Sequence, residues 1–148
     1  MFPRFEIRRF RLADLGRIQE IEHASFGKEA YDRKLFADLA RECGSLFLVA
    51  ARGRRVWGYM VTHATGDRAE LVSVAVDPAV RGKGAASALM SGTLRRLQRR
   101  GTARFSLMVK VTNDTAVRFY QKFGFRRGRR VGRYYEDGSD AWVMWRKQ

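Results

Sequence analysis

The spacing of apolar residues changes from strand-like to helical early in the chain. Residues 4–10 alternate between two faces, with Phe5 and Ile7 on one of them, which predicts a strand. From Asp14 apolar residues recur every three or four positions, as on one face of a helix, and a second helix is predicted over about 32–42. The positions predicted to face inward on these two helices are Leu15, Ile18, Ile21, Glu22, Leu35, Phe36 and Leu39.

Three strands and a long helix are predicted in the middle of the chain. The run SLFLVAA, which begins at Ser45 and is apolar from Leu46 on, predicts a buried strand, and the runs RVWGYMVTHA and AELVSVAV follow it across glycine turns. Asp77–Pro78 ends the third strand, and a helix is predicted from Gly84 to about Arg100. The inward stripe of that helix is predicted as Ala88, Leu89, Leu94 and Leu97.

The last third of the chain predicts one more strand and helix, then a closing hairpin. The segment ARFSLMVKV has strand character, and Asn113 or Asp114 caps a helix that Gly124 ends. Two strands, over roughly 126–135 and 141–147, close the chain across the turn EDGSD. The predicted order β-α-α-β-β-β-α-β-α-β-β describes an α/β or α+β fold with helices packed on a sheet.

Length and composition indicate a folded single domain over residues 1–148, because 45% of the residues are hydrophobic and 30% are charged. No apolar run approaches the roughly 18 residues that a membrane span needs. The opening MFPRFEIRRF lacks the apolar core of a secretory signal. Cys43 is the only cysteine, so no internal disulfide can form, and a reducing compartment, the cytoplasm, is predicted.

Basic residues outnumber acidic ones. With 30 Lys and Arg against 15 Asp and Glu, the net charge of +15 favours anionic partners such as a phosphorylated cofactor, an acidic peptide, RNA or a ribosome. A solvated surface in an arginine-rich proteome would explain the same charge. No RNP1-type aromatic run is present, so sequence-specific nucleic-acid binding is not predicted. Five arginines near the end of the chain either attract an anionic partner or protect an edge strand by charge. They are Arg126, Arg127, Arg129, Arg130 and Arg133.

Small and basic residues connect the strand that ends at Val76 to the helix that follows. They are Arg81, Gly82, Lys83, Gly84, Ala85 and Ala86. Small side chains let the backbone approach a ligand, and the first N–H groups of a helix lack intrahelical partners at its positive end. A pyrophosphate fits both properties, although such turns are also common for structural reasons. The pattern is neither a Walker loop nor a dinucleotide fingerprint, which would need a glycine where Ser87 stands.

Two longer segments carry recognisable patterns. In VAVDPAVRGKGAASALM, Arg81, Gly84 and Ala86 match the pattern [RQ]-x-x-G-x-[GA]. NDTAVRFYQKFGF, which runs from Asn113 to Phe125, matches the pattern N-x-x-A-x-x-x-Y-x-x-x-G-F. Both segments resemble motifs of the GNAT superfamily of N-acetyltransferases, in particular its ribosomal-protein alanine and protein N-terminal acetyltransferase branch. The opening segment and the element order also match. The resemblance implies a mixed, mostly antiparallel central sheet of about seven strands, with the fourth and fifth strands splayed apart.

The resemblance also implies a cofactor. This is acetyl-CoA, with CoA as the product, and no metal is implied. The backbone of Val74, Ala75 and Val76 would pair with the pantetheine arm. The N–H groups of residues 81–86 would hold the pyrophosphate, and Asn113 would contact the cofactor from the other side.

Acetyl transfer to an amine needs a base, because an ammonium has no lone pair with which to attack a thioester. Glu70 is the candidate base, since it stands four residues before Val74 and resembles the glutamate of E-x-x-x-x-A-[IV] in the histone-acetyltransferase branch. Strand alternation puts Glu70 on one face with Val72, Val74 and Val76. The alternative is a surface glutamate at the start of a strand.

Tyr120 is the candidate acid for the departing thiolate. By the resemblance, its side chain would lie near the thioester sulfur and donate to it. A phenol with a pKa of about 10 is protonated at neutral pH. The alternative is a core tyrosine that packs against Phe119 and Phe123.

One position departs from the resembled branch. SLMVKVTN resembles LEVRxxN of the ribosomal-protein alanine N-acetyltransferases, in which a catalytic glutamate stands where this chain has Met108. A thioether cannot take the proton, so Glu70 or an ordered water must do so, with His63 and His23 as weaker candidates. The departure also leaves open a CoA-binding module without catalysis.

The closing segment RYYEDGSDAWVMWRK resembles the RYYxDGEDAxxM tail of protein N-terminal acetyltransferases, whose paired tyrosines hold the substrate peptide. Tyr134 and Tyr135 match them. Because neighbouring residues on a strand face opposite sides, only one of the two tyrosines would line the cleft at a time. The alternative is a hairpin held by aromatic pairs with Trp142. Phe26 is also expected at the peptide site, although GKEAYD after it departs from the family's loop.

The acceptor is therefore predicted to be a protein or peptide N-terminus, either ribosomal or acidic. The enzyme would be a monomer or a homodimer. A small-molecule amine or a lysine side chain is the alternative acceptor.

Overall fold

The computed structural model describes residues 4–148, apart from the side chain of Glu29. The strands and longer helices are β1 (Glu6–Arg9), α1 (Leu15–Phe26), α2 (Arg33–Cys43), β2 (Phe47–Arg52), β3 (Arg55–Thr65), β4 (Arg68–Val76), α3 (Ala85–Arg99), β5 (Arg104–Lys110), α4 (Asp114–Lys122), β6 (Arg126–Val131) and β7 (Ala141–Lys147). This order confirms the predicted succession of elements. The strand predicted over 126–135 is shorter than expected, because a turn begins after Val131. No helix in the described part of the chain is long and apolar enough to cross a membrane.

The strands form a seven-stranded sheet in the order β1-β2-β3-β4-β5-β7-β6. β1 pairs antiparallel with β2, β2 with β3, and β7 with both β5 and β6. β4 and β5 form a parallel pair between residues 68–70 and 104–106, at the start of both strands. The predicted mixed, mostly antiparallel sheet is confirmed. The splay of the two strands beyond these residues stays a prediction.

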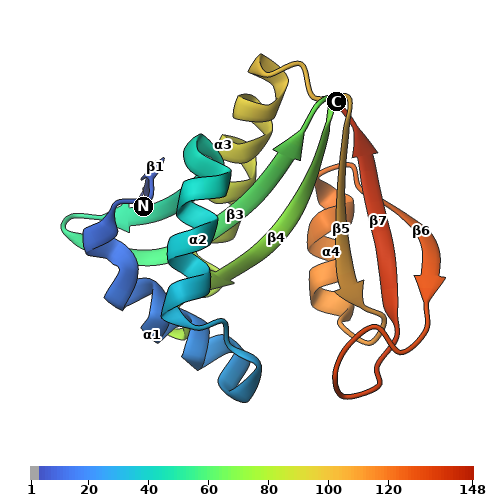
Figure 1. Cartoon of the computed structure of the whole chain (residues 1–148), viewed down its shortest axis with the longest axis horizontal. Helices are drawn as coiled ribbons and strands as arrows, with labels where there is room; N and C mark the ends of the chain where they lie inside the picture. The colour runs from blue at the N-terminus through green and yellow to red at the C-terminus, as the bar shows by residue number, and fades with distance from the viewer. Residues whose placement is uncertain (1–3) are drawn as a thin grey trace. The chain divides into compact units, whose positions relative to one another are not determined.

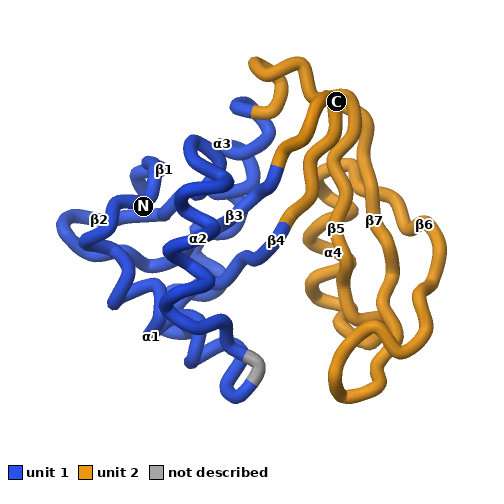
Figure 2. Tube along the Cα trace, in the orientation of Figure 1, with its two compact units in different colours: residues 1–63, 72–96 blue, residues 64–71, 97–148 orange. Residues whose placement is uncertain are grey.

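The chain divides into two compact units (Figure 2). Unit 1 comprises residues 1–63 and 72–96, and unit 2 comprises residues 64–71 and 97–148. β3, β4 and α3 therefore contribute residues to both units. The expectation of one domain over the whole chain stays a prediction.

Helices cover both faces of the strands in unit 1 (Figure 1). α1 and α2 pack on one face, where Ile18, Phe36 and Phe47 are fully buried in one cluster. α3 packs on the other face, where the Thr93 hydroxyl lies 3.3 Å from the sulfur of Met60. Burial on both faces is the reason why residues 46–51, LFLVAA, are apolar at every position.

The inward positions of two helices differ from the predicted ones. Leu35 is 38% exposed, because it stands about 100° around α2 from the fully buried Phe36. Ala88 and Leu94 are only half-buried, since they stand on the two flanks of the buried stripe of α3. The buried stripe consists of Ala85, Leu89, Met90, Thr93 and Leu97.

β4 does not alternate as predicted. Val72 and Ala75 both pack on the cluster beneath α1 and α2, although residues three apart on a regular strand face opposite sides. Val76 lies on the other side, which α3 covers. This follows because a Cβ atom added to Gly58 would come within 3.2 Å of the Val76 side chain and within 3.5 Å of that of Leu89, a residue of α3. The predicted common face, which included Val72 and Val76, is therefore wrong, because the strand is locally irregular, as at a β-bulge.

A buried carboxylate ties α1 to β3 and to the segment between the first two helices. Glu22 is 1% exposed, and it accepts hydrogen bonds from the Tyr59 hydroxyl and, at 2.7 Å, from the N–H of Tyr31. The hydroxyl of Tyr59 also lies 3.2 Å from that of Ser73. Burial and then the neighbouring carboxylate raise the pKa of Tyr59 far above its usual value, so the phenol remains a donor.

Replacing Tyr59 with phenylalanine should lower the free energy of unfolding by about 1–3 kcal/mol. The buried Glu22 would lose its hydroxyl donor, while the edge-on ring contact with Phe36 would remain. Chemical denaturation measures the loss. Tyr134→Phe is the control, because that ring is 50% exposed. An equal loss in both variants would contradict a specific role for the buried bond.

In unit 2, α4 packs on one face of β5 through aromatic rings. Phe105 contacts Phe125 at a centroid distance of 5.3 Å, and Phe125 contacts Tyr120 of α4 at 5.8 Å. The Oδ1 atom of Asn113 accepts a first-turn N–H at 3.2 Å, which confirms the predicted cap. Gly124, with a φ of 86°, follows the helix. Alternate residues of β5 face away from α4.

Candidate active site

The loop between β4 and α3 is organised by Asp77. Its carboxylate accepts the N–H of Ala79 at 2.8 Å and pairs with Arg17 at 2.5 Å. Its own N–H donates to the carbonyl of Trp57 at 2.8 Å. The backbone bond and then Arg17 lower the pKa of Asp77, so the carboxylate stays charged and holds this end of the loop.

Two glycines shape the rest of the loop. Gly82 and Gly84 have φ values of 78° and 93°, and no atom lies within 4 Å of a Cβ position on either. The first α-helical bond of α3 runs from the N–H of Ala88 to the carbonyl of Gly84 at 3.0 Å, so the preceding N–H groups have no intrahelical acceptor. Arg81 and Lys83 are exposed beside them. Open space, N–H donors, the positive end of a helix and two cations together fit a pyrophosphate.

Most of the other predicted cofactor residues in unit 1 can contribute chiefly through their backbone. The side chains of Ala75 and Ala85 are buried, at 6% and 1% exposure. Val74, Val76 and Ala86 are half-buried. This arrangement is compatible with the predicted backbone contacts to a pantetheine arm and a pyrophosphate, which stay predictions.

The C-terminal end of α1 lies against the same loop. Nη2 of Arg81 donates to the hydroxyl of Ser25 at 3.4 Å. The next residue, Phe26, is 41% exposed, and Gly27 ends the helix with a φ of 55°. No spacing in the sequence indicates a contact between residues so far apart in the chain. Phe26, an exposed aromatic residue, therefore directly follows a residue that contacts the candidate phosphate loop.

Tyr120 is buried in the aromatic cluster of unit 2, at 7% exposure. Burial, and then the nearby Tyr135, raise its pKa to about 12. Among the described residues its hydroxyl has no hydrogen-bond partner. Tyr120 thus packs as a core residue and also keeps a protonated hydroxyl that is available to a ligand.

Glu70 lies at the end of the parallel ladder, paired with Ser106, and its side chain is exposed. Ala69 pairs with Phe105, which packs towards α4, so Glu70 faces away from α4. Met108 is two residues after Ser106, so it lies on the same face as Glu70. The candidate base and the residue that replaces the expected glutamate therefore share one side of the sheet in unit 2. Both histidines, the weaker candidates, are exposed.

Tyr134 and Tyr135 lie in the turn between β6 and β7, so the expectation that they alternate along a strand is wrong. The turn keeps them together because both N–H groups donate to the carbonyl of Ser139, at 3.0 and 3.2 Å. Their rings meet edge to face with centroids 4.9 Å apart. Nζ of Lys110 lies 5.2 Å from the centre of the Tyr135 ring. Trp142 packs against arginines of β6.

The predicted site residues thus form one group in each unit. Unit 1 brings together the phosphate loop, the end of β4 and Phe26, and unit 2 contains Glu70, Asn113, Tyr120 and the tyrosine pair. The Oδ1 atom of Asn113 is used as a helix cap, which leaves its NH₂ group for a ligand. Its cofactor contact stays a prediction.

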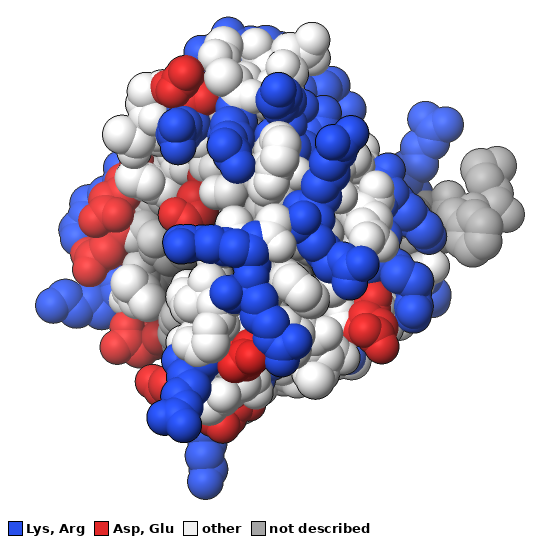
Figure 3. All heavy atoms as spheres, turned by 90° about the vertical axis from the view of Figure 1, so that its right-hand side faces the viewer, with Lys and Arg blue, Asp and Glu red and all other residues white. Residues whose placement is uncertain are grey.

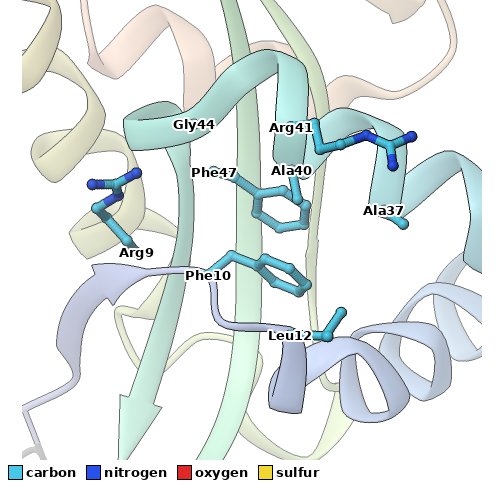
Figure 4. A pocket seen from close by; sticks show the side chains of 8 residues that line it. All are labelled: Arg9, Phe10, Leu12, Ala37, Ala40, Arg41, Gly44 and Phe47. Carbon is cyan, nitrogen blue, oxygen red and sulfur yellow. The ribbon is translucent and has the colours of Figure 1, made fainter.

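A separate hollow of about 340 Å³ opens in unit 1 between the segment after β1 and the end of α2 (Figure 4). The stacked rings of Phe10 and Phe47 lie in it, with centroids 4.3 Å apart, and Arg9 and Arg41 contribute to its lining. None of the predicted cofactor or substrate residues lines it. It is therefore not the site that the sequence motifs indicate.

Comparison with known proteins identifies the fold and the motifs. The model of the acetyltransferase (GNAT) family matches residues 12–125. The crystal structure of Ard1 from Thermoplasma volcanium superposes with a TM-score of 0.92 and 33% sequence identity, over 97% of each chain. The chain is 30% identical to the [ribosomal protein bS18]-alanine N-acetyltransferase of Escherichia coli K12, over 77% of this chain and 78% of the relative. It is 29% identical to the N-alpha-acetyltransferase of Sulfolobus acidocaldarius, over 95% of this chain and 90% of the relative.

The family match covers most of the chain, including the β4–α3 loop and Tyr120. These observations agree with one another, and the chain belongs to the acetyltransferase (GNAT) family of acetyl-CoA-dependent N-acetyltransferases.

Proposed function

We propose that the acceptor is the N-terminal amine of a protein or peptide. The observation that carries this proposal is the aromatic pair Tyr134–Tyr135, which is held in a turn with one ring half exposed. Rigid aromatic rings provide contact area for a peptide at a low cost in conformational entropy. The activities of the relatives from Escherichia coli and Sulfolobus acidocaldarius, both N-acetyltransferases named for protein substrates or α-amines, support the same acceptor class.

For the donor, N–H groups of residues 81–86 would bind the pyrophosphate of acetyl-CoA. Those of Arg81 and Lys83 already donate to the carbonyls of Pro78 and Val80, at 3.5 and 3.2 Å, so these two residues would contribute by balancing the charge with their side chains. The backbone of residues 74–76 would hold the pantetheine arm, and the NH₂ group of Asn113, which its capping bond leaves unused, would contact the cofactor. Acetyl-CoA supplies the acetyl group as a thioester whose carbonyl carbon accepts the amine.

Tyr120 would act as the acid in this transfer. As the amine nitrogen bonds to the acetyl carbon, the carbon–sulfur bond breaks and the sulfur needs a proton. The Tyr120 hydroxyl is protonated, because its pKa is about 12, and it has no competing partner among the described residues. It would give its proton to the sulfur and regain one from solvent.

Glu70 would act as the base, directly or through one water. Its carboxylate is exposed and shares a face with Met108, where the resembled branch has a catalytic glutamate. Ser106 pairs with Glu70, and Met108 is about 7 Å farther along β5. A carboxylate on the neighbouring strand would thus replace the missing one on the same side of the sheet.

Glu70→Gln should lower kcat/KM most at low pH. An α-amine with a pKa of about 8 is mostly an ammonium at pH 6.5, so transfer then depends on a base, whereas above pH 9 the amine is already neutral. We expect a loss of about 100-fold at pH 6.5 that falls below about tenfold at pH 9. Rates with one peptide across this range test it. Asp114→Asn, a charge change at the exposed start of α4, is the control. An equal loss at every pH would remove Glu70 as the base.

A peptide-library assay with mass spectrometry tests the acceptor class. Acidic peptides, alanine-first ribosomal N-termini and internal-lysine peptides with blocked N-termini should be compared. Products on free N-termini alone are expected. Products on lysine alone would overturn the proposed acceptor, and the absence of any product with these peptides would overturn it as well, in favour of a small-molecule amine as acceptor or of a CoA-binding module. A cytoplasmic location stays a prediction from the cysteine content.

A further inference from the structure

β6 is an edge strand composed largely of arginine. It ends the strand order of the sheet, and its residues 126–130 are all exposed. Arg133, which follows in the turn, is exposed as well. We refer to five side chains as the basic strip: Arg126, Arg127, Arg129, Arg130 and Arg133. Neither acetyl transfer nor the packing of unit 2 requires so much charge here.

The basic strip is poorly neutralised by the protein. Among the described residues its one acidic partner is Asp140, which accepts from Nε of Arg130 at 2.7 Å and from the backbone N–H of Arg133 at 3.0 Å. Arg126, Arg127 and Arg129 have no ion pair within the described chain. The side of the molecule that carries β6 shows far more basic than acidic surface (Figure 3). An anionic partner would therefore meet unpaired guanidinium groups.

An aromatic ring lies among these guanidinium groups. The guanidinium carbons of Arg127 and Arg130 lie 5.4 and 5.8 Å from the ring centre of Trp142, and Trp142 is half-buried. Arginine rather than lysine at every position provides planar groups that bind phosphate with two N–H donors and stack on flat rings. This combination of aromatic and arginine side chains suits nucleic acid.

The backbone of β6 is poorly suited to pair with an acidic peptide as an added strand. Its register against β7 shifts between Arg127 and Arg130, which interrupts the ladder at the middle of a six-residue strand. Gly128 in this bulge lies against Trp145, since a Cβ there would come within 3.3 Å of the ring. Recognition by side chains is therefore favoured over recognition by the strand edge.

We propose that the basic strip binds the phosphate backbone of RNA, independently of sequence. Contacts to phosphate position a nucleic acid without reading its bases, which agrees with the lack of an RNA-reading motif in the sequence. Such contacts would hold the enzyme on a ribonucleoprotein surface while its active site acts on a nearby peptide N-terminus.

Fluorescence anisotropy with a labelled RNA hairpin of about 16 base pairs tests the proposal on the full chain. The variant is Arg126→Gln/Arg127→Gln/Arg129→Gln. The matched control, Arg33→Gln/Arg52→Gln/Arg54→Gln, removes the same charge from exposed arginines of unit 1. The affinity constant K falls as salt rises, and each lost phosphate contact reduces the magnitude of the slope of log K against log[salt] by about 0.7 to 0.9. The slope of the variant should therefore be smaller in magnitude than that of the native chain by about 2 to 3. Its affinity at physiological salt should fall at least tenfold, on the order expected for such contacts, and the control should change little.

Three results would overturn the proposal. These are no RNA binding by the native chain at low salt, an equal loss in the control, or equally tight, strip-dependent binding of a poly-glutamate peptide. The last result would assign the strip to an acidic protein instead. Peptide acetylation by the variant should be unchanged, because no strip residue belongs to the proposed catalytic site. Its midpoint of thermal unfolding should also be retained, which shows that the variant is folded.

Discussion

Tyr120→Phe should lower kcat about 100-fold, which corresponds to about 2.7 kcal/mol of transition-state stabilisation, while the affinity for acetyl-CoA stays nearly unchanged. The phenyl ring would keep its contacts with Phe119 and Phe125, at 5.4 and 5.8 Å, so only the proton donor is lost. Steady-state rates combined with calorimetric binding of acetyl-CoA separate the two quantities. Turnover equal to that of the native enzyme would remove Tyr120 as the acid.

Phe125→Leu is the matched control for packing. It disturbs the same cluster, including the contact with Phe105, but keeps the hydroxyl of Tyr120. If Tyr120 were only a core residue, Phe125→Leu would lower turnover at least as much as Tyr120→Phe does. We expect instead that Phe125→Leu mainly lowers the midpoint of thermal unfolding.

The alkaline side of the pH–rate profile gives a second readout for Tyr120. Burial raises its pKa to about 12, so the phenol is protonated at all lower pH values and loses its proton only as the pH passes that value. A fall in kcat due to its deprotonation should therefore begin well above pH 10, where an ordinary tyrosine would already titrate. This limb should disappear in Tyr120→Phe.

Gly84→Val should weaken binding of acetyl-CoA by about 10- to 100-fold. A valine side chain would occupy the open space beside the loop and keep the pyrophosphate from the first N–H groups of α3, and each hydrogen bond to a charged group is worth about 1.5–3 kcal/mol. Isothermal titration with acetyl-CoA measures the loss. Retained affinity would move the pyrophosphate away from this loop.

Gly53→Val is the control for backbone strain. Gly53 also has a positive φ, 63° against 93° at Gly84, and open space at its Cβ position, but it lies in the β2–β3 turn. Both valines should therefore cost about 1–2 kcal/mol of stability. Only Gly84→Val should affect the cofactor.

The backbone conformation of the β4–α3 loop and the cap of α4 could be predicted because both depend on neighbouring residues. Gly82 and Gly84 adopt positive φ values that their lack of a side chain allows, and Asn113 caps the helix that it precedes. The pattern of Tyr134 and Tyr135 also indicated peptide binding. Their strand conformation was predicted wrongly, because hydrogen bonds to Ser139 fold this segment into a turn.

Other features have no local signal. Helical spacing predicted that Glu22 faces inward, but it did not indicate its partner, because only the approach of β3 provides the Tyr59 hydroxyl that makes the burial tolerable. The irregularity of β4 is likewise invisible in a run of small and β-branched residues. It arises where helices pack on both faces of the strand.

The sequence by itself therefore determined the family, the order of the elements, and the loop that suits a pyrophosphate. These features depend on residues a few positions apart in the sequence, because the local chain sets the backbone conformation of such residues and the direction of their N–H groups. The tertiary structure alone decided that Tyr120 is a buried donor with a raised pKa and that Glu70 shares a face with Met108. It also decided that Arg130 pairs with Asp140, whereas the other three arginines of β6 have no ion pair among the described residues. Burial, pairing and unpaired charge depend on which distant residues come together, and the spacing of residues along the chain does not contain that information.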